Sequence, residues 1–107
     1  MIDGTLAALA DPTRRQLVER LSIGPCRAGE LAEVVQMSRP ALSRHLRVLR
    51  ESGLAEEQRD PNDGRGRIYV LQPNAVIELR DWLADVSAMW SGQLDAFAQY
   101  VDGHRDA

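Results

Sequence analysis

One stretch of the sequence, residues 38–52, carries four arginines and no acidic residue before Glu51. At about 100° per residue, a helix over this stretch gathers the arginines in one arc and most apolar side chains in the other. A solvated helix face usually mixes both signs of charge, because like charges a turn apart repel one another. The arc therefore predicts a surface that binds an anionic partner, with an ordinary solvated face as the alternative.

Double-stranded DNA is the anionic partner that suits such a helix. The major groove admits a helix, and in helix-turn-helix proteins the N-terminal part of the second helix meets base edges. We therefore expect Arg39, Ser43 and Arg44 to contact bases, and Arg47 and Arg50 to contact phosphates. The DNA-binding residues predicted on this helix are Ser38, Arg39, Pro40, Ala41, Ser43, Arg44, Arg47 and Arg50. His45 falls in the apolar arc and is predicted to be a packed residue rather than a ligand.

Cap and turn signals place this helix second in a helix-turn-helix over residues 28–53. Ser38 suits an N-cap, with Pro40 in the first turn, and Gly53 suits a left-handed C-terminal cap. A two-turn helix over 28–35 precedes it, with Leu31, Val34 and Val35 facing inward. Two helices joined by a turn of three or four residues make this motif.

Upstream, a short helix is expected at 3–10, and Asp11 with Pro12 opens a second helix that Gly24 and Pro25 end. Cys26 then lies in a predicted loop. Downstream, residues 54–72 read as a β-hairpin wing with strands at 54–59 and 67–72. The tip of the wing presents Arg65 and Arg67 to the DNA backbone or the minor groove.

The last helix, predicted over residues 74–101 with Gly103 beyond it and a charged tail after it, carries an apolar stripe too large for this small domain to cover. Exposed apolar patches of that size usually mark an interface, and a two-fold dimer is the commonest one. A helix folded back on its own domain is the alternative. The predicted dimer interface comprises Leu6, Leu9, Trp82, Leu83, Val86, Met89, Trp90, Leu94 and Phe97.

The composition is consistent with one small domain of 107 residues. The chain has a net charge of -3, but residues 38–67 form a positive segment, since they hold seven arginines and five acids. The single cysteine, Cys26, excludes an intrachain disulfide. A signal peptide or membrane span is not apparent, so a soluble cytoplasmic protein is expected. The two histidines and one cysteine lie in unrelated segments and suggest no catalytic group, cofactor site or enzyme.

Three stretches of the chain resemble the ArsR/SmtB superfamily of repressors. They are residues 7–15 (AALADPTRR), 38–54 (SRPALSRHLRVLRESGL) and 67–71 (RIYVL). The resemblance implies a mainly helical winged helix-turn-helix with the order α-α-α-α-β-β-α, which dimerises through its first and last helices. It also implies a repressor that binds an inverted-repeat operator and leaves it in response to a signal.

The metal sites of that superfamily have no counterpart here. Residues 30–35 (ELAEVV), which match its cysteine-containing box, hold no cysteine or histidine, and the predicted last helix holds no histidine. The chain resembles the subgroup without metal ligands, for which a protein, a small molecule or an unknown inducer is expected. Two alternatives stay open: a metal-responsive repressor that uses carboxylates and His104, and a protein-interaction module that has lost DNA binding.

Overall fold

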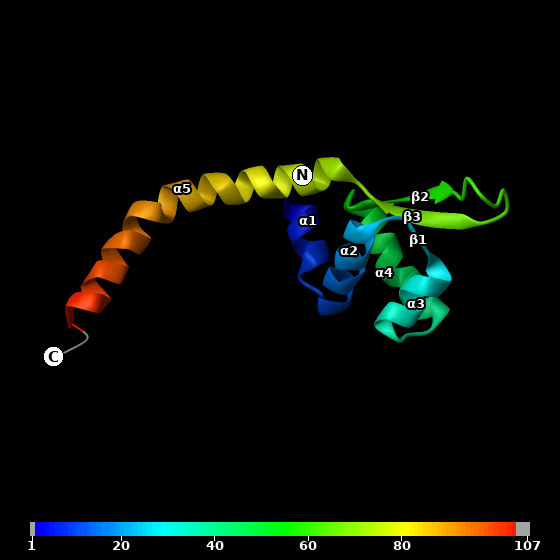
Figure 1. Ribbon diagram of the computed structural model, residues 1–107, viewed down its shortest axis with the longest axis horizontal. Coiled ribbons are helices and arrows are strands. Elements are labelled where there is room, and N and C mark those ends of the chain that lie inside the picture. Colours follow the sequence, from blue (N-terminus) through cyan, green and yellow to red (C-terminus); the bar gives the residue numbers. More distant parts are fainter. Residues whose placement is uncertain (1, 105–107) are drawn as a thin grey trace.

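The structure, a computed structural model, describes residues 2–104 and contains helices, a small antiparallel sheet and one long terminal helix. The elements in chain order are α1 (Ile2–Leu9), α2 (Pro12–Ile23), β1 (Cys26–Arg27), α3 (Ala28–Val35), α4 (Arg39–Glu51), β2 (Ala55–Arg59), β3 (Arg67–Leu71) and α5 (Pro73–His104). In Figure 1, α1–α4 form a cluster, β2 and β3 extend from it as a hairpin, and α5 leaves it in the opposite direction. The predicted helical cluster with a hairpin wing is therefore present.

Leucines from three helices form the core. Leu17 and Leu21 recur at helical spacing on α2, Leu31 lies on α3, and each is at most 3% exposed. On α4, the buried leucines are Leu42, Leu46 and Leu49. Burying one leucine contributes about 1.5–3 kcal/mol, so three on α4 fix which face of this helix points outward.

The N-terminal caps of α2 and α4 are those predicted. The Asp11 carboxylate accepts a hydrogen bond from the Arg14 N–H at 3.1 Å, and the Ser38 hydroxyl accepts one from the Ala41 N–H at 3.3 Å. Each side chain satisfies a backbone donor that a helix start leaves unpaired. Pro12 follows its cap at the first helical position, as expected.

The C-terminal cap of α4 also agrees with its prediction. Gly53 has φ +81°, a conformation that costs other residues about 1–2 kcal/mol. The Leu54 N–H donates to the Leu49 carbonyl at 3.0 Å, and the Gly53 N–H donates to the Arg50 carbonyl at 3.1 Å. These two bonds make a Schellman motif, which ends α4 and turns the chain into the wing.

Two local predictions are wrong. Cys26 lies in strand β1 and not in a loop: it pairs with Tyr69, and Arg27 pairs with Ile68, so the sheet has three strands in the order β1-β3-β2. Val34 is 44% exposed, whereas Leu31 is fully buried. On a helix Val34 lies about 100° from Val35, and the two-turn α3 has room for only a narrow inward face.

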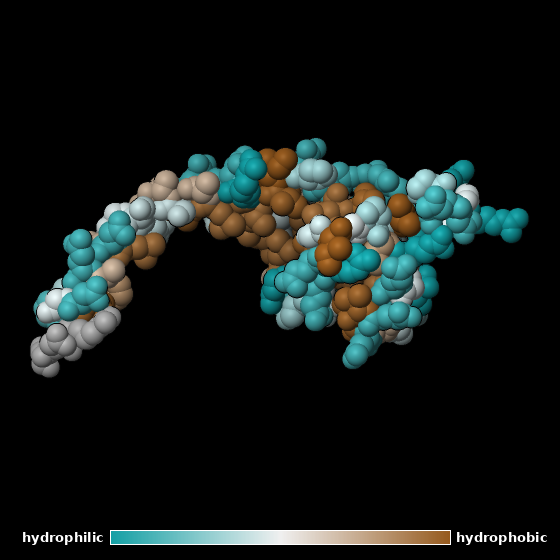
Figure 2. Space-filling model, viewed as in Figure 1, coloured by the Kyte–Doolittle hydropathy of each residue, from teal (hydrophilic) through white to brown (hydrophobic). Residues whose placement is uncertain are grey.

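Helix α5 extends beyond its predicted end, since Gly103 lies inside it and His104 is its last residue. The predicted charged tail after His104 falls outside the described residues. The start of α5, where Ala75 is buried, packs on α1. Figure 2 shows apolar surface on the concave side of α5. The described residues contain no helix that is both long and apolar enough to cross a membrane.

Candidate nucleic-acid interface

The outer face of α4 presents the arginines that the sequence predicted. Arg39, Arg44 and Arg47 are exposed, and none of them forms an ion pair with any residue between 2 and 104. Ser38, Pro40 and Ser43 are exposed with them, and Ala41 is partly buried. The structure thus brings three uncompensated positive charges to one helix face that also presents small side chains.

Arg50, the fourth arginine of α4, forms an ion pair. Its Nη1 donates to Oε2 of Glu57 on β2 at 2.9 Å. The expectation of four uncompensated arginines on α4 is therefore wrong for Arg50. Glu51, which follows Arg50 in α4, forms no ion pair with it among the described residues. The partner of Arg50 comes from the wing, because the chain reverses at Gly53 and brings β2 alongside the end of the helix.

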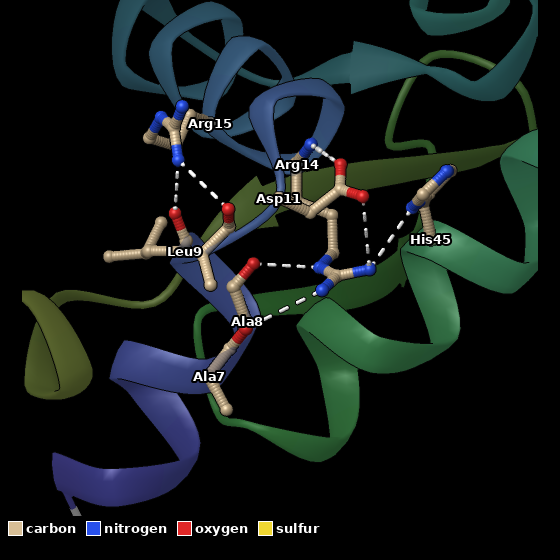
Figure 3. Close-up of polar contacts among 8 residues, drawn as sticks. Ala7, Ala8, Leu9, Asp11, Arg14, Arg15 and His45 are labelled. Atoms are coloured by element: carbon tan, nitrogen blue, oxygen red, sulfur yellow. Dashed lines mark hydrogen bonds and ion pairs between the residues drawn. The ribbon is translucent and has the colours of Figure 1, made fainter.

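Arg14 connects α4 to the corner between α1 and α2 (Figure 3). Its Nε donates to the Ala8 carbonyl at 2.7 Å, near the end of α1, and its Nη1 lies 3.2 Å from Nδ1 of His45 on α4. A guanidinium only donates hydrogen bonds, so His45 accepts this one through Nδ1. His45 is partly buried, in agreement with its prediction as a packed residue, and the bond adds an orienting contact to α4.

Arg15 adds a second contact to the same corner. Its Nη1 donates to the carbonyls of Leu9 and Ala10 at 2.8 and 3.1 Å. The last carbonyls of a helix have no partner within the helix, and a cation near them is favourable. The two adjacent arginines at the start of α2 therefore bind the carbonyls at the end of α1, a role that no local sequence pattern indicates.

The tip of the wing is an ordered turn held by Arg27 of β1. The Arg27 guanidinium bonds to the Asp60 carboxylate and lies 3.7 Å from that of Asp63. Asp60 also accepts from the Asn62 N–H at 2.9 Å. The Asn62 bond foremost, and the Arg27 guanidinium, hold the pKa of Asp60 below its usual value, although burial opposes them. These acids thus order the wing and do not simply oppose an anionic partner.

The two predicted wing residues differ in their surroundings. Arg65 is exposed and forms no ion pair with the described residues. Arg67 is exposed as well, but its Nε lies 3.8 Å from Oε1 of Glu57. A cleft of about 610 Å³ separates the wing from α3 and the start of α4, and its charged lining residues are Arg27, Glu30, Glu33, Arg39, Glu57 and Arg67.

The residues predicted for a dimer interface lie on α1 and α5. Leu9 is partly buried, and Leu6 is exposed. On α5, Trp90 is 51%, Leu94 58% and Phe97 66% exposed. The remaining predicted interface residues are Trp82, Leu83 and Met89, which are exposed, and Val86, which is partly exposed.

The groups considered for metal binding or redox chemistry have other contacts. Nδ1 of His104 lies 2.8 Å from the carbonyl oxygen of Tyr100, and the His104 ring stacks on the Tyr100 ring. Cys26 is buried, and its thiol donates to the Glu30 carboxylate at 3.5 Å. Burial raises the pKa of this thiol, which disfavours the reactive thiolate. Residues 2–104 bring no three metal-ligating side chains together.

Comparison with known proteins places the chain among transcriptional regulators. The model of "Bacterial regulatory protein, arsR family" matches residues 11–57. The chain is 41% identical to the HTH-type transcriptional regulator Rv2034 of Mycobacterium tuberculosis (strain ATCC 25618 / H37Rv), over 97% of this chain and 92% of that protein. It is 30% identical to the transcriptional repressor SdpR of Bacillus subtilis (strain 168), over 77% of this chain and 88% of that protein.

The fold gives the same assignment. A crystal structure of the ArsR family transcriptional regulator RHA00566 matches with a TM-score of 0.73 and 34% identity, over 83% of this chain and 94% of that chain. Proteins of this family are transcriptional regulators and not enzymes, which confirms the prediction that the chain is no enzyme. The chain belongs to the ArsR family of winged helix-turn-helix transcriptional regulators.

Proposed function

We propose that the protein is a sequence-specific repressor that binds an inverted-repeat operator as a homodimer, with α4 in the major groove. The observation that carries the proposal is the outer face of α4, where Arg39, Arg44 and Arg47 are exposed and form no ion pair within residues 2–104. The three buried leucines on the opposite face and the His45 bond to Arg14 hold that face outward. Several relatives, SdpR among them, are named as repressors.

The two ends of α4 have different roles in this proposal. Arg39, Ser43 and Arg44 lie toward its N-terminus, where helices of this motif read base edges. Arg47 lies one turn further along and supplies a phosphate contact, which adds affinity without sequence preference. Arg65 at the exposed tip of the wing adds a contact to the minor groove or its phosphates.

The exposed stripe of α5 supports the homodimer. Trp90, Leu94 and Phe97 recur at intervals of three and four residues, and each is more than half exposed in the single chain. Water-exposed apolar area of this extent is unfavourable, and a second copy of α5, with Leu6 of α1, covers it in a two-fold arrangement. Two α4 helices then face successive major grooves, which requires an inverted repeat.

The release signal in this proposal is not a metal ion. Residues 30–35 of α3 offer no cysteine or histidine, and Nδ1 of His104 is engaged by the Tyr100 carbonyl. A small molecule or a protein is the class of inducer that remains, acting on the dimer and thereby on the spacing of its two α4 helices.

Selection of bound duplexes from a random pool, followed by sequencing, tests the proposal. We expect an inverted repeat. Arg44→Ala should cost about 1–3 kcal/mol of discrimination at one position of each half-site, whereas Arg47→Ala should weaken all sequences alike and reduce the salt slope by about one per contact. Arg80→Ala on α5 removes the same charge at a distance and is the matched control. Wild-type sequence preference in Arg39→Ala, Arg44→Ala and their double variant would contradict the placement of α4.

A further inference from the structure

Glu57 holds two of the arginines that the sequence assigned to DNA. Its Oε2 lies 2.9 Å from Nη1 of Arg50 on α4, and its Oε1 lies 3.8 Å from Nε of Arg67 on β3. The two oxygens of one carboxylate are thus shared between the recognition helix and the wing. A phosphate also presents oxygens with a shared negative charge, and guanidinium groups bind both kinds of anion.

The position of Glu57 follows from the register of the sheet. Glu57 pairs with Tyr69, and Arg67 lies two residues from Tyr69 on the same strand. Side chains two residues apart share a face, so Glu57 and Arg67 are diagonal neighbours on the face that α4 approaches. This face borders the cleft between the wing and the start of α4, which Arg39 also lines.

The stability of the fold does not account for this arrangement. The side chains of Glu57, Arg50 and Arg67 are 30%, 39% and 58% exposed. Ion pairs with that exposure contribute a median of about 0–1 kcal/mol, because water and salt screen them. Removing the carboxylate should therefore leave folding almost unchanged, while the charge on the DNA-facing side rises by one per protomer.

We propose that Glu57 is a specificity-determining residue that occupies the place of a DNA phosphate between Arg50 and Arg67, and so weakens binding to non-operator DNA. The inference rests on the proposed function. Non-specific binding is almost entirely the contact of arginines with phosphates. In the free protein Glu57 compensates two of these arginines, so a duplex must displace it before it gains their contacts. A random duplex is held by phosphate contacts alone and meets this cost in full, whereas a duplex fixed in register by the base contacts of α4 depends less on Arg50 and Arg67.

The test compares wild type, Glu57→Gln and the control Glu19→Gln, which removes one exposed carboxylate from α2. Two probes of about three helical turns are used: a random-sequence duplex and the duplex recovered by selection. For Glu57→Gln on the random duplex, we expect about tenfold tighter binding at low salt and a salt slope steeper by about one to two per protomer. The selected duplex should gain less, so the specificity ratio falls.

A second measurement identifies the cause of the tighter binding. The gain from Glu57→Gln should disappear when Arg50→Ala and Arg67→Ala are present, because the freed arginines supply it. Circular dichroism and a thermal melt establish that each variant is folded. Weaker binding of both duplexes by Glu57→Gln would show that Glu57 orients the arginines, and unchanged binding would show that Glu57 has no effect on DNA binding. Either result would overturn this inference and leave the proposed function standing. If the wild type bound neither duplex, the proposed function would be overturned as well.

Discussion

Leu94 offers the sharpest test of the dimer, because it lies in the middle of the exposed stripe on α5. The side chain is 58% exposed in the single chain. Full burial of a leucine contributes about 1.5–3 kcal/mol, so covering the exposed part contributes roughly 1–2 kcal/mol. Two-fold symmetry doubles this to roughly 2–4 kcal/mol for each dimer. Leu94→Asp forfeits that contribution and adds two carboxylates to an apolar interface.

The expected result is a dimer dissociation constant at least 100-fold higher than that of the wild type, since about 2.8 kcal/mol corresponds to that factor. Fluorescence-detected sedimentation over a dilution series from micromolar to nanomolar measures it. Ala88→Asp is the matched control, because Ala88 is exposed about 120° around the helix from Leu94, on the side that carries Asp81 and Asp95. If Leu94→Asp and Ala88→Asp both dissociate at the same concentration as the wild type, the stripe on α5 is not the dimer interface.

Three further outcomes test other parts of the structure. Because the pKa of Asp60 is below its ordinary value of 3.8, the stabilisation that Asp60 provides is complete above that pH and declines as the pH falls toward the folded-state pKa. The urea midpoint of the wild type should thus exceed that of Asp60→Asn at pH 7, and the two midpoints should converge below about pH 4; a constant gap would contradict the pairing with Asn62 and Arg27. Gly53→Ala should lower the free energy of unfolding by about 1–2 kcal/mol in urea titrations, because alanine is strained at this φ, whereas a neutral effect would contradict the Schellman cap. The affinity for the selected duplex should be the same with a chelator and with a panel of divalent metal ions; a tenfold change with any metal would restore the metal-responsive alternative.

Local sequence was sufficient where the deciding interaction spans three to five residues. The caps at Asp11, Ser38 and Gly53 were predicted correctly, because each bonds to a backbone group within one turn. The leucines of α4 were assigned to the core for the same reason, since helical periodicity alone separates their face from that of the arginines. The predicted ends of the helices moved by only a few residues.

Sequence reasoning failed where the partners are far apart in the chain. Strand β1 has two residues, too few to produce a pattern, and exists because β3 lies beside it. Arg27 bonds to Asp60 across 33 positions, and Arg14 bonds to His45 across 31. In the sequence Asp60 is one acid in a polar loop, whereas in the fold its bond to Arg27 anchors the wing. Arg27 before α3 and the acids Asp60 and Asp63 in the wing can be seen in the sequence, but no local pattern pairs them.

Helix periodicity and caps are local properties of the chain, and they settle which face of α4 points outward and which residues that face presents. Which of those arginines are uncompensated depends on contacts between distant parts of the chain. The turn at Gly53 brings β2 back along α4 and sets Glu57 against Arg50, while Arg39, Arg44 and Arg47 keep their charge unpaired among residues 2–104. The net charge at the DNA-facing surface depends on distances across the fold, and those distances are fixed only when the wing packs beside the helix.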